Sequence, residues 1–509
     1  MLAKVTSFAL VGLEGVPVEV ETDINKGMTS YELVGLPDAA VKESRERVHS
    51  ALRNARFHFP VNRITVNLAP ADIRKEGSHY DLPIAVSILK ASGQLGEAQT
   101  EGYVMLGELA LDGGVRGVSG VLPVLISAKR KGFRRFILPY ANANEAAYIE
   151  GAEVYAVKSL SEAARFLTGE ITLSPVQPKD FRAAVSHSSY DCDMSFIKGQ
   201  AVAKRALEIA VAGGHNILFS GPPGTGKTML AKCIPTIMPD LTFEEALDVT
   251  SIHSVAGELG EEGIVTLRPF RTPHHTATTV SLCGGGNSKI RPGEISKAHR
   301  GVLYLDELPE YSRSALEALR QPLEDRKITV SRAAGAVTFP ADFMLCASMN
   351  PCPCGNYGSE YKQCTCTPAQ IKKYRSRISG PLLDRIDILV EVDAVRYEDL
   401  YSDAKEETSA VVKARVERAR AVQRERFCGE QIDLNSQMGE RQLMEYCPLS
   451  PECKRVLGGI FERLSLSARA RARIIKVART IADLSYSAEI LPEHILEAAS
   501  YRTFGSGDD

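Results

Sequence analysis

The pattern of apolar and polar positions first identifies a block of mixed secondary structure at the start of the chain. Residues 61–68 alternate between the two kinds of residue, which predicts a strand with one buried face. Residues 82–89 are almost continuously apolar and predict a buried helix with Pro83 in its first turn. Residues 136–139 predict a further short strand. Residues 1–170 are therefore expected to mix strands and helices.

Three further segments follow this block. Prolines and the lack of a clear period mark residues 171–190 as a linker. Residues 191–395 contain apolar runs that end in the polar motifs described below, which indicates an α/β domain. In residues 396–509 apolar positions recur at helical spacing, first over 406–427 and again over 464–484. The last segment is therefore expected to be helical.

The composition restricts the interpretation only moderately. At 509 residues the chain is too long for one core and indicates roughly two to four domains. Because the net charge is −2, any contact with DNA requires a local basic patch or the channel of an assembly. No apolar run reaches about 18 residues, and the first residues lack a signal-peptide core. We therefore expect a cytoplasmic protein that does not enter a membrane and keeps its cysteines reduced.

Residues 221–228 fit the G-x-x-x-x-G-K-[ST] pattern of a phosphate-binding loop. The apolar run 216–220 precedes them and the helix-like run 229–234 follows, as the motif requires. The glycines let backbone N–H groups turn toward a phosphate, Lys227 would reach the β- and γ-phosphates of ATP, and Thr228 would hold Mg²⁺. A glycine-rich turn before an ordinary helix is the alternative. The predicted cofactor-binding residues are Gly221, Pro222, Pro223, Gly224, Thr225, Gly226, Lys227, Thr228 and Asp306.

A second motif favours the phosphate loop over that alternative. The apolar run 302–305 ends in Asp306 and Glu307, which predicts a buried strand with two carboxylates at the edge where α/β domains bind ligands. Asp306 would accept from the water shell of Mg²⁺, and Glu307 would polarise the attacking water, so that hydrolysis is the expected reaction. Alone, such a pair usually marks only a strand end; about 80 residues after a phosphate loop it indicates function.

These motifs and the run 347–355 resemble an AAA+ ATPase, and the runs 380–387 and 476–484 resemble its magnesium-chelatase-like branch. With a first block similar to the proteolytic domain of Lon, nearly the whole chain resembles the bacterial competence protein ComM family. The resemblance implies an α/β fold, an AAA+ P-loop core with a helical lid, preceded by a Lon-protease-like α+β domain. It also implies a hexameric ring ATPase, a helicase that drives branch migration of DNA during homologous recombination in natural transformation.

The resemblance implies catalytic roles for two residues of the core. Asn350 matches the polar sensor that helps place the attacking water, although an asparagine before proline also initiates turns. Arg385 matches the arginine finger that is offered to the ATP of a neighbouring subunit, which suits a permanently charged guanidinium. The alternative for Arg385 is an ion pair with Asp384 or Asp387.

The resemblance also implies a role for an arginine of the helical lid. Arg469 matches the lid arginine that senses the γ-phosphate of ATP. Arg471 and Arg473 are close competitors, and on a helix only Arg473 shares a face with Arg469.

Basic residues outside these motifs are candidates for contact with DNA. Residues 268–275, Lys289 and Arg291 belong to the insert between the two ATPase motifs, and inserts of this branch face the pore of the ring. Residues 372–377 form a second basic run. In a flexible loop such side chains could follow a phosphate backbone. A solvated loop or helix face is the alternative for each of them.

Four of the eleven cysteines are clustered, which indicates a metal site: Cys352, Cys354, Cys364 and Cys366. Four thiolates satisfy a tetrahedral zinc ion, although the spacing is C-x-C rather than the commoner C-x-x-C. Disulfides are disfavoured in a reducing cytoplasm. Four free thiols crowded into a polar loop are the remaining alternative. We expect a structural zinc.

The first block is expected to lack peptidase activity. A Ser–Lys dyad needs a hydroxyl beside a lysine of lowered pKa. By resemblance, the serine position falls at His79, with Ser78 one residue away, and the lysine position falls at Leu122. A structural, ring-building or DNA-contacting role is therefore favoured.

Other functions make different predictions. A chelatase-type or chaperone-type ATPase that remodels a protein partner is the main alternative, and stimulation of ATP hydrolysis by DNA would separate it from a DNA motor. An ATP-dependent protease requires a working dyad. A passive nucleotide switch predicts weak hydrolysis despite Glu307.

Overall fold

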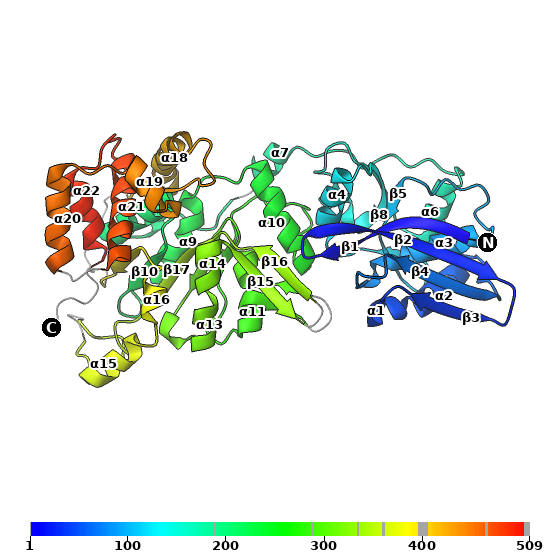
Figure 1. Cartoon of the computed structure of the whole chain (residues 1–509), viewed down its shortest axis with the longest axis horizontal. Coiled ribbons are helices and arrows are strands. Elements are labelled where there is room, and N and C mark those ends of the chain that lie inside the picture. The colour runs from blue at the N-terminus through cyan, green and yellow to red at the C-terminus, as the bar shows by residue number, and fades with distance from the viewer. Residues whose placement is uncertain are drawn as a thin grey trace.

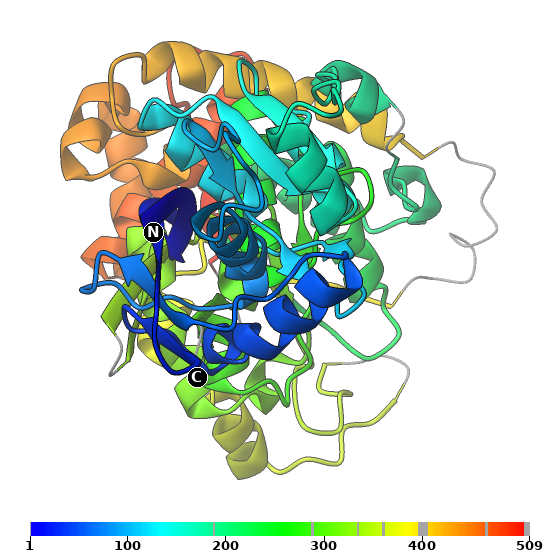
Figure 2. The ribbon, with the colours of Figure 1, turned by 90° about the vertical axis from the view of Figure 1, so that its right-hand side faces the viewer.

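The computed structural model describes residues 2–186, 189–286, 290–332, 335–358, 362–394, 406–463 and 467–502. Figure 1 shows three regions in a row: an N-terminal region in blue and cyan, a central region in green and yellow, and C-terminal helices in orange and red. Figure 2 looks along the chain from the N-terminal region, which lies in front of the rest. Within the described ranges, no helix is long and apolar enough to cross a membrane.

The N-terminal region is built on a seven-stranded mixed sheet with the order β3-β4-β2-β1-β5-β8-β9. The central pairs β1–β2 and β2–β4 are antiparallel, whereas β3–β4, β1–β5, β5–β8 and β8–β9 are parallel. The strands are β1 (Leu2–Val11), β2 (Glu14–Asn25), β3 (Ser30–Val34), β4 (Arg63–Ala69), β5 (Tyr103–Met105), β8 (Arg135–Pro139) and β9 (Glu153–Val157).

Both faces of this sheet are covered by helices. Val5 and Ala9 of β1 belong to one apolar cluster, together with residues of helices on one side, whereas Phe8 belongs to the cluster on the other side. This alternation is the period of two expected of a strand buried on both faces. The first side is covered by α2 (Ser44–Asn54), α3 (Asp81–Ala91) and α6 (Leu160–Leu167), and the second by α4 (Val121–Arg130).

Three elements predicted for the first block are confirmed: β4, α3 and β8 occupy the positions expected for a strand, a buried helix and a strand. The segment expected to be an irregular linker differs from the prediction, because it contains the short helix α7 (Phe181–Ser186). The Phe181 ring packs against Phe243 of the central region, with ring centroids 5.5 Å apart. Apolar contact therefore orders part of a segment whose sequence lacks a helical period.

The central region contains a five-stranded sheet with the order β11-β14-β17-β10-β18, in which every pairing is parallel. Its three central strands are continuously buried, as expected of a parallel sheet covered on both faces. The strands are β10 (Ile217–Ser220), β11 (Phe270–Arg271), β14 (Val302–Leu305), β17 (Met344–Met349) and β18 (Ile388–Glu391). All carboxyl-terminal strand ends therefore meet at one edge of the sheet.

The helices of the central region cover that sheet on both sides. One apolar cluster joins Ile217, Phe219 and Tyr304 to α8 (Ala201–Gly213) and α9 (Lys227–Ile237), and the other joins Leu218 and Leu303 to the opposite side. The second side includes α11 (Thr279–Cys283), α13 (Arg313–Ala318) and the hairpin of β15 (Lys327–Arg332) and β16 (Gly335–Pro340). The central region also contains α10 (Phe243–Ala256), β12 (Gly284–Gly285), β13 (Arg291–Pro292), α12 (Glu294–Lys297), α14 (Arg320–Asp325), α15 (Pro368–Arg375) and α16 (Gly380–Leu383).

The C-terminal region is helical and shares the first of these two clusters with the sheet (Figure 1). The predicted helices 406–427 and 464–484 correspond to α18 and α21, which begin three to four residues later than expected, at Ser409 and Ala468. The helices of this region are α18 (Ser409–Arg426), α19 (Glu440–Tyr446), α20 (Pro451–Arg463), α21 (Ala468–Leu484) and α22 (Pro492–Ser500). Their packing fixes the C-terminal helices against the central sheet.

Candidate nucleotide site

The predicted phosphate loop directly follows β10 at the carboxyl edge of the sheet. Gly221 lies so close to the neighbouring chain that a Cβ atom there would come within 2.1 Å of the Val392 carbonyl oxygen. Gly224 and Gly226 have φ angles of 82° and 87°, a left-handed conformation that glycine adopts without strain. The glycines therefore form a tight loop that delivers the chain to the start of α9.

Lys227 is the first residue of α9 and its side chain turns back into the loop. Its Nζ donates to the carbonyl oxygens of Gly221 and Pro222 at 2.7 Å each, and only 8% of the residue is exposed. Burial lowers the pKa of Lys227, and the nearby charges of Asp306 and Glu307 oppose that change. The ammonium is thus held where a bound phosphate would replace weak carbonyl acceptors with charged oxygens.

The Mg²⁺ position predicted at Thr228 and Asp306 is formed by neighbouring oxygen atoms. Thr228 Oγ1 lies 3.4 Å from Asp306 Oδ2 and 3.3 Å from the Tyr304 hydroxyl. The other oxygen of Asp306 accepts from the Ser348 hydroxyl. A threonine hydroxyl beside a fixed carboxylate is the oxygen donor set that Mg²⁺ prefers, so the residues present fit this ion.

Glu307 extends from the end of β14 in a left-handed conformation, with φ of 52°. Its backbone N–H donates to Asp306 Oδ1 at 3.1 Å, which explains how the non-glycine residue is held there. Its carboxylate is exposed and lies 3.5 Å from His275, measured from Oε2 to Nδ1. The carboxylate thus projects from the same edge as the phosphate loop, where it is accessible to water.

Asn350 directly follows β17, which lies between β14 and β10. The sheet therefore brings Asn350 to the same edge as the phosphate loop and Asp306. The backbone N–H of Asn350 donates to the hydroxyl oxygen of the buried Tyr374, whose pKa is raised to about 12 mainly by burial. Its position agrees with a sensor role, which stays a prediction.

The sequence interpretation missed three residues of this site. Tyr304 lies inside an apolar strand run and was included there only as a core residue, although its hydroxyl meets Thr228. Ser348 lies two residues before Asn350, so the alternation of β17 is the available signal that it points to the same region. His275 was assigned to an insert loop, and its contact with Glu307 spans a separation that no local pattern reveals.

Neither the predicted arginine finger, Arg385, nor the predicted lid arginine, Arg469, has a contact with the phosphate loop, Asp306 or Glu307 in the described part of the chain. Arg385 does not pair with Asp384 or Asp387, the predicted alternative; its guanidinium bonds to Glu324 and to the Pro381 carbonyl oxygen. The two aspartates instead lie 3.6 and 3.2 Å from Arg473 of α21. Arg469 is exposed one turn earlier on α21.

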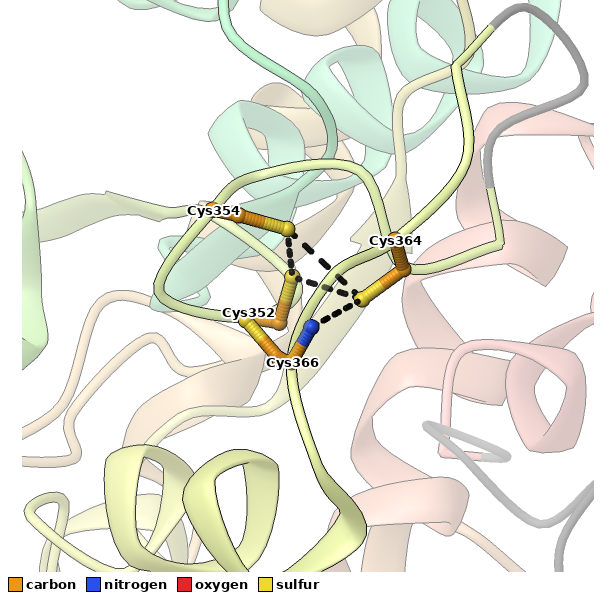
Figure 3. Close-up of side chains that lie close together, drawn as sticks. All are labelled: Cys352, Cys354, Cys364 and Cys366. Carbon is orange, nitrogen blue, oxygen red and sulfur yellow. Dashed lines mark hydrogen bonds between the residues drawn. The ribbon is translucent and has the colours of Figure 1, made fainter.

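The four clustered cysteines form a second candidate site. Their Sγ atoms lie within 4.8 Å of one another, and Figure 3 shows the side chains gathered from two stretches of one loop. The separations are 3.4 Å for Cys352–Cys354, 3.7 Å for Cys352–Cys364 and 3.6 Å for Cys354–Cys364. A tetrahedron with zinc–sulfur bonds of about 2.3 Å places its sulfurs roughly 3.8 Å apart. The residues therefore fit a zinc ion, and the structure contains no disulfide among them.

Backbone N–H groups surround these sulfurs as well. Those of Thr365 and Asn356 lower the pKa of Cys354 to about 5, and the N–H of Tyr357 lies 3.3 Å from Cys352 Sγ. Gly355 of the same loop abuts the phosphate loop, since a Cβ atom there would come within 2.7 Å of the Pro223 ring. The cysteine loop therefore supports one side of the phosphate loop.

The basic residues of the insert that are candidates for contact with DNA differ in their surroundings. Arg268 and Arg271 are not on a flexible loop, because β11 pairs with β14 and both side chains are tied down. Arg268 lies 3.1 Å from Glu245, and Arg271 lies 2.7 Å from Glu294. The expectation of a flexible loop was therefore wrong for these two residues, whose charges form internal ion pairs, whereas their contact with DNA stays a prediction.

The other basic candidates keep their status as predictions. Arg291 is exposed in the short hairpin of β12 and β13, whereas Lys289 lies outside the described residues. In α15 and the turn after it, Lys372, Lys373 and Arg377 are exposed, and Arg377 pairs with Glu310 at 2.7 Å.

The residues compared with a protease dyad are engaged in other contacts. The Ser78 hydroxyl donates to Glu108, and the His79 ring lies 2.9 Å from the Phe8 carbonyl oxygen. Leu122 is buried in the first turn of α4, where its backbone N–H donates to Glu145. The lack of peptidase activity stays a prediction.

Comparisons with known proteins connect these features to one family. Residues 193–400 match the family model described as magnesium chelatase, subunit ChlI, residues 20–142 match that of subunit ChlI of Mg-chelatase, and residues 406–502 match its C-terminal domain. The chain is 44% identical over 504 residues to competence protein ComM of Haemophilus influenzae, covering 98% of this chain and 97% of the relative. It is 43% identical to the uncharacterized protein YifB of Escherichia coli, with the same coverage. A magnesium-chelatase 67 kDa subunit of Chlorobaculum parvum is 30% identical over 161 residues, which are 30% of this chain and 23% of that protein.

Proposed function

The chain belongs to the family of competence protein ComM, a magnesium-chelatase-like group of AAA+ proteins, and on this basis we propose that it is an ATP-driven DNA motor. The motor would promote branch migration of DNA during homologous recombination in natural transformation. Hydrolysis of ATP at the carboxyl edge of the central sheet would supply the energy.

The contact of Thr228 with Asp306, beside the phosphate loop and Glu307, carries the ATPase part of this proposal, and the similarity to competence protein ComM carries the DNA part. Lys227 and the loop N–H groups would hold the β- and γ-phosphates, and Mg²⁺ would be held by Thr228 and Asp306. Bound Mg²⁺ neutralises charge that develops on the phosphates. Glu307 would accept a proton from the attacking water, with Asn350 helping to place that water. The reaction is therefore hydrolysis.

A ring explains the position of Arg385. This residue precedes β18, whose Ile388 pairs with Ile217 at the start of β10, so it lies near the amino edge of the sheet. The phosphate loop follows the other end of β10, and four strand residues span about 13 Å. Arg385 therefore cannot reach the ATP of its own subunit. In a homo-hexamer it would instead contact the phosphates held by its neighbour, with Arg469 as the lid arginine.

The cysteine cluster would hold a structural zinc through Cys352, Cys354, Cys364 and Cys366. Four thiolates close the coordination shell of the ion, so no position is left for catalysis. The ion would fix the loop that abuts Pro223. Its contribution is therefore to the stability of the loop and, through that contact, to the shape of the phosphate loop.

Branch migration of a synthetic four-way junction by the full-length chain tests this function. With ATP and Mg²⁺ the wild-type protein is expected to convert the junction into duplex products, and Glu307→Gln is expected to convert less than about one hundredth as much. Arg385→Ala should keep nucleotide binding but lose the reaction. If the wild-type hydrolyses ATP without moving the junction, the DNA-motor proposal fails while the ATPase assignment remains.

The partial match to a magnesium-chelatase subunit favours one second candidate, an ATPase that remodels a protein partner. That function predicts ATP hydrolysis indifferent to every DNA and stimulated by the partner. ATP hydrolysis measured with and without the junction DNA therefore distinguishes the two.

A further inference from the structure

A cavity of about 370 Å³ lies at the amino edge of the central sheet, opposite the phosphate loop. Its walls include Asn216 before β10, Gly301 before β14 and Phe343 before β17. The C-terminal helical region closes the other side with residues from α18, from the segment before α19 and from α21. The cavity therefore lies between two regions of the chain, and no part of a nucleotide bound to the phosphate loop of the same subunit can enter it.

The lining is strongly basic, with seven arginine and lysine side chains against four carboxylates. Each carboxylate has a basic neighbour, which leaves three cations in excess. The four pairs are Arg268–Glu245 at 3.1 Å, Arg300–Asp342 at 3.0 Å, Arg473–Asp387 at 3.2 Å and Arg385–Glu324.

Among the described residues, two of the three remaining cations have no carboxylate partner, and the third shares a carboxylate with another arginine. Arg420 donates to the Val211 carbonyl oxygen at 2.6 and 3.1 Å, and Lys476 donates to the Ser436 carbonyl oxygen at 3.0 Å. Arg326 lies 3.7 Å from Asp342, which already pairs with Arg300. Neutral carbonyl oxygens compensate a buried positive charge poorly, because they carry only a partial negative charge.

Three arginines of the same lining also have buried N–H groups without a hydrogen-bond acceptor in the described part of the chain. These groups are Nε of Arg300, Nε of Arg385 and Nη1 of Arg473. Carboxylate oxygens of Glu245 and Asp384 lie 4.0 Å from the first and 3.6 Å from the third, beyond hydrogen-bonding distance. The side chain of Arg385 is nine-tenths buried. Buried donors without acceptors are rare in folded proteins, and several around one cavity indicate that an absent ligand supplies the acceptors.

The pKa values of several basic groups in the lining are lowered, so burial in the cavity disfavours their charged forms. Burial, assisted by the nearby charge of Arg268, lowers the pKa of Arg420 to about 9. Burial likewise lowers the pKa of Arg326, Arg473 and Lys476. An anion inside the cavity would reverse these shifts, because it stabilises the charged form of each group.

From the cavity, the excess of cations and the orphaned donors, we propose that this amino-edge cavity binds a phosphate-bearing ligand with at least two negative charges. Guanidinium groups bind phosphoryl oxygens through two parallel hydrogen bonds, which suits a lining of several arginines. The volume falls in the range of small-molecule sites, about 300–1,000 Å³. The ligand would bridge the central sheet and the C-terminal helices, so its binding would stabilise their contact.

Two sources can supply this chemistry. The ligand is either a free phosphorylated small molecule or the phosphate chain of a nucleotide held by a neighbouring copy of the protein. The second source rests on the proposed ring, whereas the site itself does not depend on the phosphate loop of its own chain.

Titration calorimetry with inorganic pyrophosphate tests the site in full-length protein carrying Lys227→Ala, which weakens the phosphate loop as a competing site. We expect this protein to bind one pyrophosphate per chain and to show a raised Tm in its presence. Adding Arg420→Gln is expected to weaken binding about 10- to 100-fold, since one charge-assisted hydrogen-bonding group is lost. Lys476→Gln is a second test in case Arg420→Gln impairs folding.

A matched control is available on the same helix as Arg420. Arg418 is exposed on α18 and its guanidinium packs over Tyr486, outside the cavity. Arg418→Gln removes the same charge from the same helix and is expected to leave pyrophosphate affinity unchanged. An equal loss in both variants would assign the effect to net charge and overturn the proposal.

Assembly with ATP-loaded Glu307→Gln protein identifies the source of the phosphate. If the ligand is a neighbour's nucleotide, assembly will displace pyrophosphate from the Lys227→Ala chains; if it is a free molecule, binding will persist. Both results support the site. No pyrophosphate or triphosphate binding by the Lys227→Ala protein at millimolar concentration, with no change in Tm, would overturn it, whatever the result for ATP hydrolysis.

Discussion

The two edges of the central sheet carry opposite kinds of charge. At the carboxyl edge, Asp306 and Glu307 follow β14 and face a glycine loop whose one cation, Lys227, is held by carbonyl oxygens. At the amino edge, basic side chains outnumber carboxylates around the cavity. The first edge suits Mg²⁺ and the phosphates that Mg²⁺ accompanies, whereas the second suits phosphates alone. A single subunit therefore separates the proposed site of hydrolysis from a cluster of positively charged side chains.

Because of this separation, the two faces that a subunit would present to its neighbours in a ring carry different charges. In a closed ring the carboxyl edge of one copy would lie against another face of its neighbour, and a heterologous contact of this kind repeats around the ring. Acidic groups with Mg²⁺ on one side and arginines on the other are electrostatically complementary. Substitutions at the carboxyl edge should therefore change the binding and hydrolysis of ATP by each subunit. Substitutions at the amino edge should instead change the activity that a subunit gains from its neighbour in the ring.

Lys227→Ala is expected to have the largest effect. It removes two or more charge-assisted hydrogen bonds to phosphate, together worth about 3–6 kcal/mol, so ATP affinity should fall at least about 100-fold. Fluorescent-nucleotide titration measures this loss. Unchanged affinity would show that the carboxyl edge is not the nucleotide site.

Glu307→Gln should separate binding from hydrolysis at the same edge. The amide keeps the size of the side chain but cannot accept the proton of water, so turnover should fall about 100- to 1,000-fold. ATP affinity should stay within a few-fold of the wild type. Undiminished turnover in a steady-state phosphate-release assay would remove Glu307 from the mechanism.

Cys354→Ser tests whether the cysteine loop supports the phosphate loop. Loss of one thiolate should lower the zinc content and reduce Tm, by roughly 2–4 °C for each kcal/mol lost. Cys428→Ser is the matched control, because Cys428 is an exposed thiol outside the cluster. Wild-type protein that contains no zinc by mass spectrometry after metal-free purification would contradict the zinc assignment.

His275→Ala is expected to have the smallest effect. The ring lies 3.5 Å from Glu307 and restricts an otherwise exposed carboxylate. Its loss should change turnover only a few-fold, since an exposed pair of this kind is worth about 0–1 kcal/mol. Nucleotide affinity should be unaffected. A loss as large as that of Glu307→Gln would mean that His275 itself takes part in hydrolysis.

The contrast between the two edges also explains how much the sequence predicts. The phosphate loop and the Asp306–Glu307 pair are contiguous motifs attached to strand ends, so the sequence shows their residues and the parallel sheet brings them together. The cysteine cluster is nearly as local. These features could be inferred before any coordinates were known.

The amino-edge cavity could not be inferred in this way. Arg326, Arg420 and Lys476 come from three separate elements, and each is an ordinary charged residue in its local pattern. The same holds for Arg268, which was assigned to a flexible loop but lies next to an edge strand and pairs with Glu245. Only the packing of the C-terminal helices against the sheet brings these charges to one place.

We propose that this chain couples ATP hydrolysis to DNA. The most direct test is the rate of ATP hydrolysis by purified full-length protein alone, with single-stranded DNA and with a four-way junction. We predict strong stimulation by DNA that is lost in Arg385→Ala, as expected if neighbouring subunits complete each other's sites. Robust hydrolysis that no DNA changes would contradict the DNA-motor account and leave an ATPase that acts on a protein partner.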